Sequence, residues 1–361
     1  ENGSQTANTE LLPYACFGVA CAGLLYAVLA ALFKAFGTKA VMRYFPPIVT
    51  GPIIICIGLT LSSTAIDSCR SNWWIALVAI GIVVVCNIWG KGMIKIIPIL
   101  LGVVGSYVVA AIAGQVDFTP VAEAAWIGLP FQWQDTLFGL FSRPDLDTSL
   151  LITSAVTIMP LALATMVEHI GDICAISSTC ERNYLVDPGF HRTLLGDGLA
   201  TSLASLFGAP ANTTYGENTG VLALSRVYDP KVIRIAAVLA VILSFSPKFA
   251  ALISCMPTAT MGGVSMVLYG MISAVGVRNV VENQVDFSNS RNVIVAAIIM
   301  VLAIGINYSG AVTFQVGSAT ISLSGLAVAA LVGILLNAIL PGKDYEFGTD
   351  LKGDTSVNFK V

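Results

Sequence analysis

Two stretches of the sequence place carboxylates within strongly apolar surroundings. The first holds Glu168 and Asp172 four residues apart, with His169 next to Glu168. Residues four apart share one face of a helix. Two carboxylates on one apolar face repel each other and are poorly solvated, so we expect at least one of them to hold a proton near neutral pH. The pattern indicates a group that takes up and releases protons.

The second stretch reads Gly-Ala-Pro-Ala-Asn-Thr-Thr-Tyr-Gly-Glu-Asn-Thr-Gly over 208–220 and contains Glu217. Its glycines, proline and threonines interrupt any helix, and the Thr-Thr-Tyr run at 213–215 favours extended structure. At membrane depth, irregular backbone is tolerated only where it is buried in protein or lines a cavity. We therefore expect a short strand that leads into a half-helix near Glu217 and Asn218, with freed backbone groups forming a polar site.

These carboxylates stand out because the chain carries few charges. Of its 361 residues, 56% are hydrophobic and 11% are charged, and the mean hydropathy is +0.84. Soluble domains carry about 25% charged residues, and a soluble protein of this size could not cover its surface with so few. The composition predicts a multi-pass protein in a lipid bilayer. The net charge of -3 argues against nucleic acid as a partner.

Apolar runs that could cross the bilayer recur along the whole chain. A spanning helix needs about 20 mainly apolar residues, and a long polar connection over 114–148 separates two groups of such runs. The predicted spans cover 11–33, 47–63, 73–89, 94–113, 150–173, 193–207, 213–225, 232–253, 260–277, 292–306 and 321–340.

The lysines and arginines give these spans an orientation. If the connections alternate between the two sides of the membrane, all of these residues except Arg70, Arg143 and Lys248 fall on one side. Cytoplasmic loops carry an excess of Lys and Arg. That side is therefore predicted to be cytoplasmic, together with the tail over 342–361.

The sequence offers no residue set typical of a metal site, a cofactor site or a hydrolytic enzyme. Its eight cysteines are scattered without a C-x-x-C spacing, and we expect no cofactor and no catalysis. His191 is expected in a loop or at a helix start, and Asp197 is expected to pair inside the protein.

Two similar segments suggest an internal repeat. Phe-Pro-Pro-Ile-Val-Thr-Gly at 45–51 and Met-Pro-Thr-Ala-Thr-Met-Gly at 256–262 each lead into an apolar span. The chain enters these two spans from opposite sides, which is typical of the inverted repeats of secondary transporters. Since the first half then has fewer spans, and the chain begins at Glu1, we expect the first three spans to be missing.

Four motifs in order resemble the nucleobase–ascorbate (nucleobase:cation symporter-2) transporter family, which includes bacterial uracil permeases. They are Glu-His-Ile-Gly-Asp at 168–172, Asp-Pro-Gly-Phe-His-Arg at 187–192, Asn-Thr-Thr-Tyr-Gly-Glu-Asn-Thr-Gly at 212–220 and Met-Gly-Gly-Val-Ser at 261–265. The resemblance implies an all-α membrane fold of two inverted seven-span repeats, in which a core domain moves against a gate domain.

The resemblance also assigns segments to those domains. It places 1–33 in the core as part of the first repeat and 149–255 in the core with the substrate site. It places 34–148 and 256–341 in the gate, and leaves 342–361 as a cytoplasmic tail.

The implied function is secondary active import of uracil, or a closely related nucleobase, by proton symport across the inner (plasma) membrane. By motif, Glu168 matches the glutamate that hydrogen-bonds the pyrimidine ring. Glu217 matches a second such glutamate, with backbone contacts from Gly216 and Tyr215. These residues form the predicted substrate site.

Asp172 occupies the position at which a uracil permease carries a histidine linked to proton coupling. The resemblance therefore makes Asp172, with Glu168, the expected coupling pair, and His169 and Asn218 supporting residues. Sodium remains an alternative coupling ion, and a homodimer remains open.

The substrate could also be a purine or xanthine. A site of carboxylates and backbone N–H groups complements the N–H donors and carbonyl acceptors of a neutral nucleobase. An anion transporter of related fold is disfavoured, because Glu168 and Glu217 would repel an anion.

Overall fold

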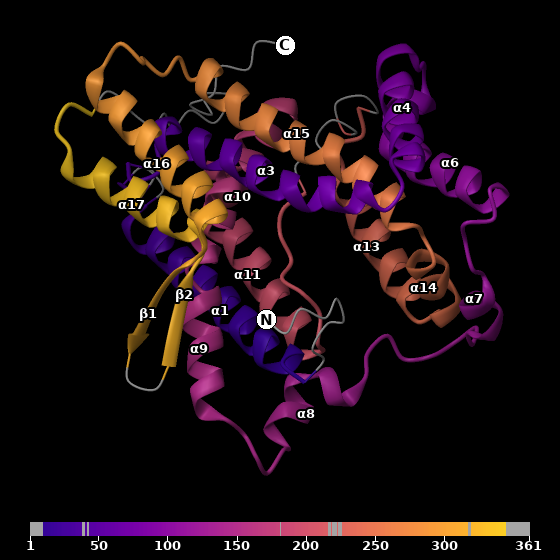
Figure 1. Ribbon diagram of the computed structural model, residues 1–361. Helices are drawn as coiled ribbons and strands as arrows, with labels where there is room; N and C mark the ends of the chain where they lie inside the picture. The colour runs from indigo at the N-terminus through magenta and orange to yellow at the C-terminus, as the bar shows by residue number, and fades with distance from the viewer. Residues whose placement is uncertain are drawn as a thin grey trace. The chain divides into compact units, whose positions relative to one another are not determined.

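The structure is a computed structural model that describes residues 10–37, 40–41, 43–180, 182–215, 218, 222, 226–316 and 319–343. The described part is mainly α-helical, as the composition predicts (Figure 1). The chain divides into two compact units. Unit 1 comprises Glu1–Cys56, Phe131–Gly216 and Val275–Val361, and unit 2 comprises Ile57–Pro130 and Glu217–Ala274.

The elements of unit 1 come from three separate parts of the chain. They are α1 (Leu12–Phe36), the start of α3 (Pro47–Arg70), the short helical turn η1 (Trp133–Asp135), α8 (Leu137–Phe141), α9 (Thr148–Ile158), α10 (Leu161–Thr179), the π-type turn η2 (Leu185–Gly189), α11 (Phe190–Leu206), the end of α15 (Thr258–Glu282), α16 (Ser290–Ser309), β1 (Val312–Val316), β2 (Ala319–Leu323) and α17 (Gly325–Ile339).

Unit 2 is built from two segments. Its elements are the rest of α3, α4 (Trp73–Trp89), α5 (Met93–Ile96), α6 (Pro98–Ile112), α7 (Thr119–Glu123), α13 (Pro230–Ser244), α14 (Pro247–Ser254) and the start of α15.

Polar side chains at the ends of the apolar runs start several of these helices. Asp147 accepts a hydrogen bond from Ser149 N at 2.8 Å at the start of α9, and Asp229 accepts one from Lys231 N at 2.9 Å at the start of α13. Such caps satisfy backbone donors that have no partner within the helix. The caps therefore fix where the apolar stretches begin as helices.

In unit 1, α1 packs along α11 and α9 (Figure 1). Helices α1 and α11 approach closely at two glycines, because a Cβ atom on Gly198 would lie 2.6 Å from the Gly23 carbonyl oxygen and would also overlap Tyr26. The Ser202 hydroxyl donates to the Ala20 carbonyl oxygen at 3.1 Å across the same interface. Small residues at a helix crossing allow the backbones to approach this closely.

The carboxyl-terminal part of unit 1 is a helix pair with a hairpin between its members. The antiparallel strands β1 and β2 pair Val312 with Leu323 and Val316 with Ala319. The hairpin joins α16 to α17, which pack together, and β2 lies beside α9 (Figure 1).

In unit 2, α4 packs against α6 and α15 through small side chains. A Cβ atom on Gly263 of α15 would lie 2.5 Å from the carbonyl oxygen of Ala76. Helices α13 and α14 are bent by 92° at a short break. The bend is tied to the loop that follows α7, because Lys248 N donates to the Ala125 carbonyl oxygen at 3.0 Å and Gly128 N donates to that of Phe245 at 2.9 Å.

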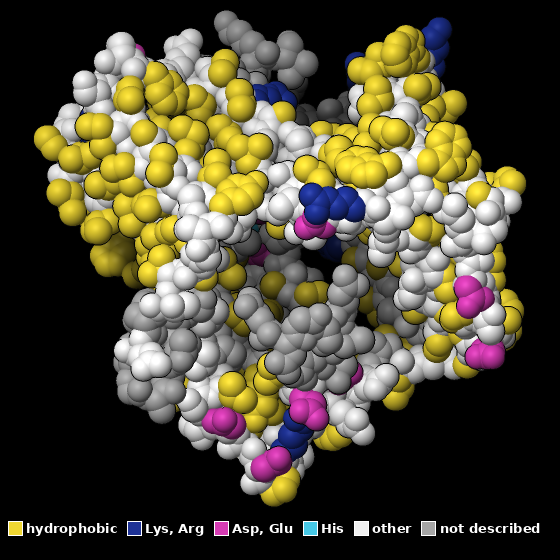
Figure 2. Space-filling model, viewed as in Figure 1, with side chains coloured by type: hydrophobic (Ala, Val, Ile, Leu, Met, Phe, Trp, Pro, Cys, Tyr) yellow, Lys and Arg dark blue, Asp and Glu magenta, His cyan; other side chains and the backbone are white. Residues whose placement is uncertain are grey.

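Within the described residues, five helices are long and apolar enough to cross a bilayer, or six if α13 and α14 count as one bent span. Three shorter apolar helices, Trp73–Trp89, Pro98–Ile112 and Gly325–Ile339, also match predicted spans. The surface of unit 1 over α16 and α17 is covered by hydrophobic side chains (Figure 2), including exposed Val301, Leu335 and Ile339. An apolar face of this kind suits contact with lipid.

The structure corrects three details of the sequence prediction. Residues 213–215 do not form a strand, because no partner strand lies beside them in the described chain to receive their hydrogen bonds. The span predicted over 321–340 begins with β2, and α17 starts only at Gly325. The span predicted over 150–173 has a short break at Pro160 between α9 and α10, and Thr148–Ile170 is still one of the five stretches long and apolar enough to cross a bilayer. Most of the span predicted over 213–225 lies outside the described residues.

The glycine crossing of α1 and α11 can be tested with a matched pair of substitutions. We expect Gly198→Ala to destabilise the protein by about 1–3 kcal/mol, because the new methyl group overlaps α1. Gly196→Ala, two residues earlier in α11, should be neutral or stabilising by about 0.5–1 kcal/mol, because a Cβ there meets nothing within 4 Å. Thermal unfolding in detergent, followed by tryptophan fluorescence, measures both. Equal shifts in the two variants would contradict the packing described.

Candidate functional site

Helix α10 carries the first group of predicted site residues. Glu168 and Asp172 lie one turn apart on this continuous helix, and Glu168 is half-buried. His169 is 4% exposed and Asp172 is 9% exposed. Because α10 begins after Pro160, the helix starts inside the apolar run and these polar residues fall in its middle.

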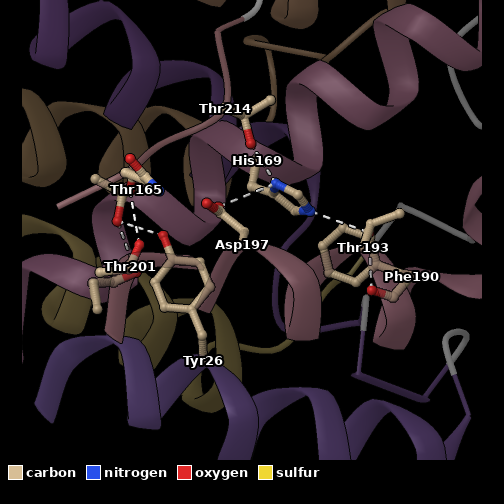
Figure 3. Close-up of polar contacts among 10 residues, drawn as sticks. Tyr26, Thr165, His169, Phe190, Thr193, Asp197, Thr201 and Thr214 are labelled. Atoms are coloured by element: carbon tan, nitrogen blue, oxygen red, sulfur yellow. Dashed lines mark hydrogen bonds and ion pairs between the residues drawn. The ribbon is translucent and has the colours of Figure 1, made fainter. Parts of the chain in front are cut away.

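The imidazole of His169 is held on both sides (Figure 3). Its Nδ1 is within hydrogen-bond distance of the Thr214 hydroxyl and lies 3.5 Å from Oδ2 of Asp197. Its Nε2 lies 3.1 Å from the Thr193 hydroxyl oxygen. The Phe190 ring, which is fully buried, packs against the imidazole with centroids 5.3 Å apart.

Two further hydrogen bonds connect neighbouring elements to this cluster (Figure 3). The Tyr26 hydroxyl of α1 donates to Thr165 Oγ1 of α10 at 2.6 Å. The Thr201 hydroxyl of α11 donates to the Asn212 carbonyl oxygen at 3.1 Å. Segment 209–215, which has no regular secondary structure, is therefore held to α11 at Asn212 and to α10 at Thr214.

The loop between α10 and α11 sets the position of Phe190 and Thr193. Arg182 forms an ion pair with Asp187 at 2.8 Å, and this hydrogen bond raises the pKa of Arg182. Phe190 then packs edge-on against Phe33 of α1, with ring centroids 4.7 Å apart. The start of α11 is thereby fixed against both α1 and α10.

The cluster formed by His169, Thr193, Asp197 and Thr214 contains one carboxylate and lies beside two more. Asp197 contacts His169, and Glu168 and Asp172 lie on the same helix as His169. No group of His, Cys, Asp and Glu among the described residues could hold a metal ion. The arrangement can exchange a proton and can accept hydrogen bonds from N–H donors.

Comparison with known proteins identifies the class to which this site belongs. Residues 4–312 match the model of a permease family. The chain is 40% identical over 340 residues to the uracil permease of Bacillus caldolyticus and 39% identical over 340 residues to that of Bacillus subtilis (strain 168), covering 91% of this chain and 75% of each relative. It is 34% identical over 333 residues to the uracil permease of Escherichia coli (strain K12), covering 89% of this chain and 73% of that one. The chain belongs to this permease family, the nucleobase–ascorbate transporters.

The relatives are named permeases, so the chain is a transporter and not an enzyme. The resemblance found in the sequence is confirmed. The apolar helices of the chain agree with a multi-pass membrane protein.

Only part of the second group of predicted site residues lies within the described chain. Tyr215 lies at the end of the irregular segment and is 49% exposed. Asn218 is helical and exposed. Gly216 and Glu217 lie outside the described residues. The roles predicted for all of these residues stay predictions.

Three residues of the permease cluster received no functional role from the sequence. Asp197 was expected to pair inside the protein, and it does so with His169 at 3.5 Å. Its position between Gly196 and Gly198 in an apolar run was the available signal. Tyr26 and Thr193 gave no signal, since a lone Tyr or Thr in an apolar helix is common. His191 lies at the start of α11, as expected.

Proposed function

We propose that this permease imports uracil, or a closely related nucleobase, across the inner (plasma) membrane by proton symport. The observation that carries the proposal is the 34–40% identity to proteins named uracil permeases over about 90% of this chain. In this proposal Glu168, Glu217, Gly216 and Tyr215 bind the substrate.

The chemistry of the cluster suits a neutral, planar base. Carboxylates such as Glu168 and Glu217 accept hydrogen bonds from ring N–H groups, and free backbone N–H groups donate to ring carbonyls. A site of this type discriminates strongly against analogues that lack the matching groups, because its buried polar groups are then left unpaired. His169, which follows Glu168, and Asn218, which follows Glu217, are supporting residues of the proposed site.

The burial of Asp172 beside Glu168 on α10 supports the proposal of proton coupling. Asp172 is 9% exposed and one turn from Glu168, and two nearby carboxylates in a poorly solvated site do not both ionise cheaply. A proton taken up with the substrate would neutralise the pair. Movement across the membrane then avoids the cost of carrying an unneutralised charge.

We assign the moving parts as the sequence suggests. In this proposal 1–33 and 149–255 form a core that carries the substrate, and 34–148 and 256–341 form a gate against which the core moves by alternating access. The protein needs no cofactor in this mechanism, and a homodimer in the bilayer is compatible with it.

The substrate glutamate can be tested directly. We expect Glu217→Ala to abolish uracil binding, because the ring N–H groups lose their acceptor, and Glu217→Gln to retain weak binding through its amide oxygen. Binding of labelled uracil to the purified protein measures this, with xanthine, thymine and uric acid as competitors. Unchanged affinity in Glu217→Ala, with normal expression, would remove Glu217 from the site. Preferential displacement by xanthine would favour a purine substrate.

Substitution of the proposed coupling residue, Asp172, should change uptake and leave binding intact. We expect Asp172→Asn to keep uracil binding and to flatten the pH dependence of uptake, because the asparagine amide does not titrate. Uptake into proteoliposomes at several external pH values measures this, and Asp117→Asn in the exposed 114–118 loop is the control. Equal proton dependence in Asp172→Asn would move the coupling role to another carboxylate. Uptake that follows a sodium gradient at fixed pH would show that the coupling ion is sodium.

A further inference from the structure

We propose that Thr193 fixes the tautomer of His169 and that Thr214 passes the proton state of His169 to the substrate segment. This inference rests on the proposed function, because the segment that it controls leads into the predicted uracil site. Thr193 and Thr214 act as positioning residues, since neither needs to touch the substrate.

The first step follows from counting hydrogens. The hydroxyl of Thr193 has one proton, and it donates that proton to the Phe190 carbonyl oxygen at 3.0 Å. Thr193 Oγ1 therefore meets Nε2 of His169, 3.1 Å away, as an acceptor. A hydrogen bond at this distance requires Nε2 to carry a proton. Thr193 thus selects the Nε2–H form of the neutral imidazole.

The second step concerns the other ring nitrogen. With Nε2 permanently protonated, the only site on His169 that gains or loses a proton is Nδ1. Nδ1 lies within hydrogen-bond distance of Thr214 Oγ1 and 3.5 Å from Asp197 Oδ2. Without a proton, Nδ1 accepts the hydroxyl proton of Thr214. With a proton, Nδ1 becomes a donor and the hydroxyl proton of Thr214 has to turn to another acceptor.

The third step is the position of Thr214 in the chain. Segment 209–215 is irregular and leads directly to Gly216 and Glu217. It is held at Asn212 by the Thr201 hydroxyl, a bond that does not involve His169. The contact of Thr214 with His169 depends on protonation, whereas the contact of Asn212 with Thr201 does not. Proton uptake at Nδ1 therefore changes only the end of the segment nearest the site.

The titratable groups around His169 come from the described elements that pack near it. Helices α9 and α17, which pack against α10, carry no titratable side chain, and η2 contributes Asp187, which is paired with Arg182. The other titratable groups on the elements that bear on His169 are Glu168, Asp172 and Cys174 on α10, Asp197, His191 and Arg192 on α11, Tyr14, Cys16, Cys21, Tyr26 and Lys34 on α1, and Tyr215 beside Thr214. Asp197 contacts the imidazole, with its Oδ2 3.5 Å from Nδ1, so it is the partner for a proton on Nδ1.

The tautomer can be measured without any substrate. The sequence has two histidines, so His191→Gln leaves His169 as the only imidazole, and ¹⁵N-histidine labelling of this variant in lipid nanodiscs reports it alone. We expect Nε2 to stay protonated at every pH and Nδ1 to be the nitrogen that titrates. Thr193→Val, which keeps the shape but loses the acceptor, should give a mixture of tautomers, and Thr193→Ser should restore the single form. A ring protonated on Nδ1 in its neutral state would overturn the proposal.

The link to the substrate segment is tested by a double-mutant cycle on uracil affinity. Thr193 and Thr214 are connected through His169, so we expect Thr193→Val and Thr214→Val each to weaken binding by about fivefold to tenfold, and the double variant to be little worse than either. Thr201→Val, the control, should combine with Thr193→Val multiplicatively, as independent sites do.

Multiplicative losses from Thr193→Val and Thr214→Val would overturn the link. If the wild-type protein binds no uracil, the proposed function fails, and the ¹⁵N spectra still decide whether Thr193 sets the tautomer.

Discussion

A polar group inside a bilayer has no water to bind, so it must find its partner within the protein. In this permease, the constraint explains why a histidine, two threonines and an aspartate from three segments meet at one point. His169 is almost fully buried, and each of its ring nitrogens has a side-chain neighbour. The cluster is therefore as much a requirement of folding in lipid as it is a candidate for function.

The cluster depends in turn on how closely the helices approach. Gly23 and Gly198 bring the backbones of α1 and α11 together, which places Asp197, next to Gly198, on the side of α10. Phe190 lies between Phe33 and His169 and fixes the start of α11. Packing of small and aromatic residues thus positions polar groups that could not attract one another over a longer distance.

The sequence predicted the membrane class, most helices and the family, because these follow from long apolar runs and from motifs of adjacent residues. It also predicted that Glu168 and Asp172 share a helix face, since a helix converts spacing into geometry. It did not predict the β1–β2 hairpin, because β1 lies between the spans predicted over 292–306 and 321–340 and only the end of β2 lies inside the second of them. It gave no role to Thr193 or Tyr26, because their partners lie on other helices and no local pattern reveals contacts between helices.

The carboxylates near His169 form two kinds of pair, one within a helix and one between helices. Glu168 and Asp172 are one turn apart on α10, so the helix fixes the spacing of their backbone positions. Asp197 and His169 belong to different helices, so their distance of 3.5 Å depends on how α10 and α11 pack. A pair within one helix can store a proton, whereas a pair between helices can couple that proton to a movement. The proposed proton symport needs both properties, and the structure places Asp197 of α11 beside His169 on the helix that carries Glu168 and Asp172.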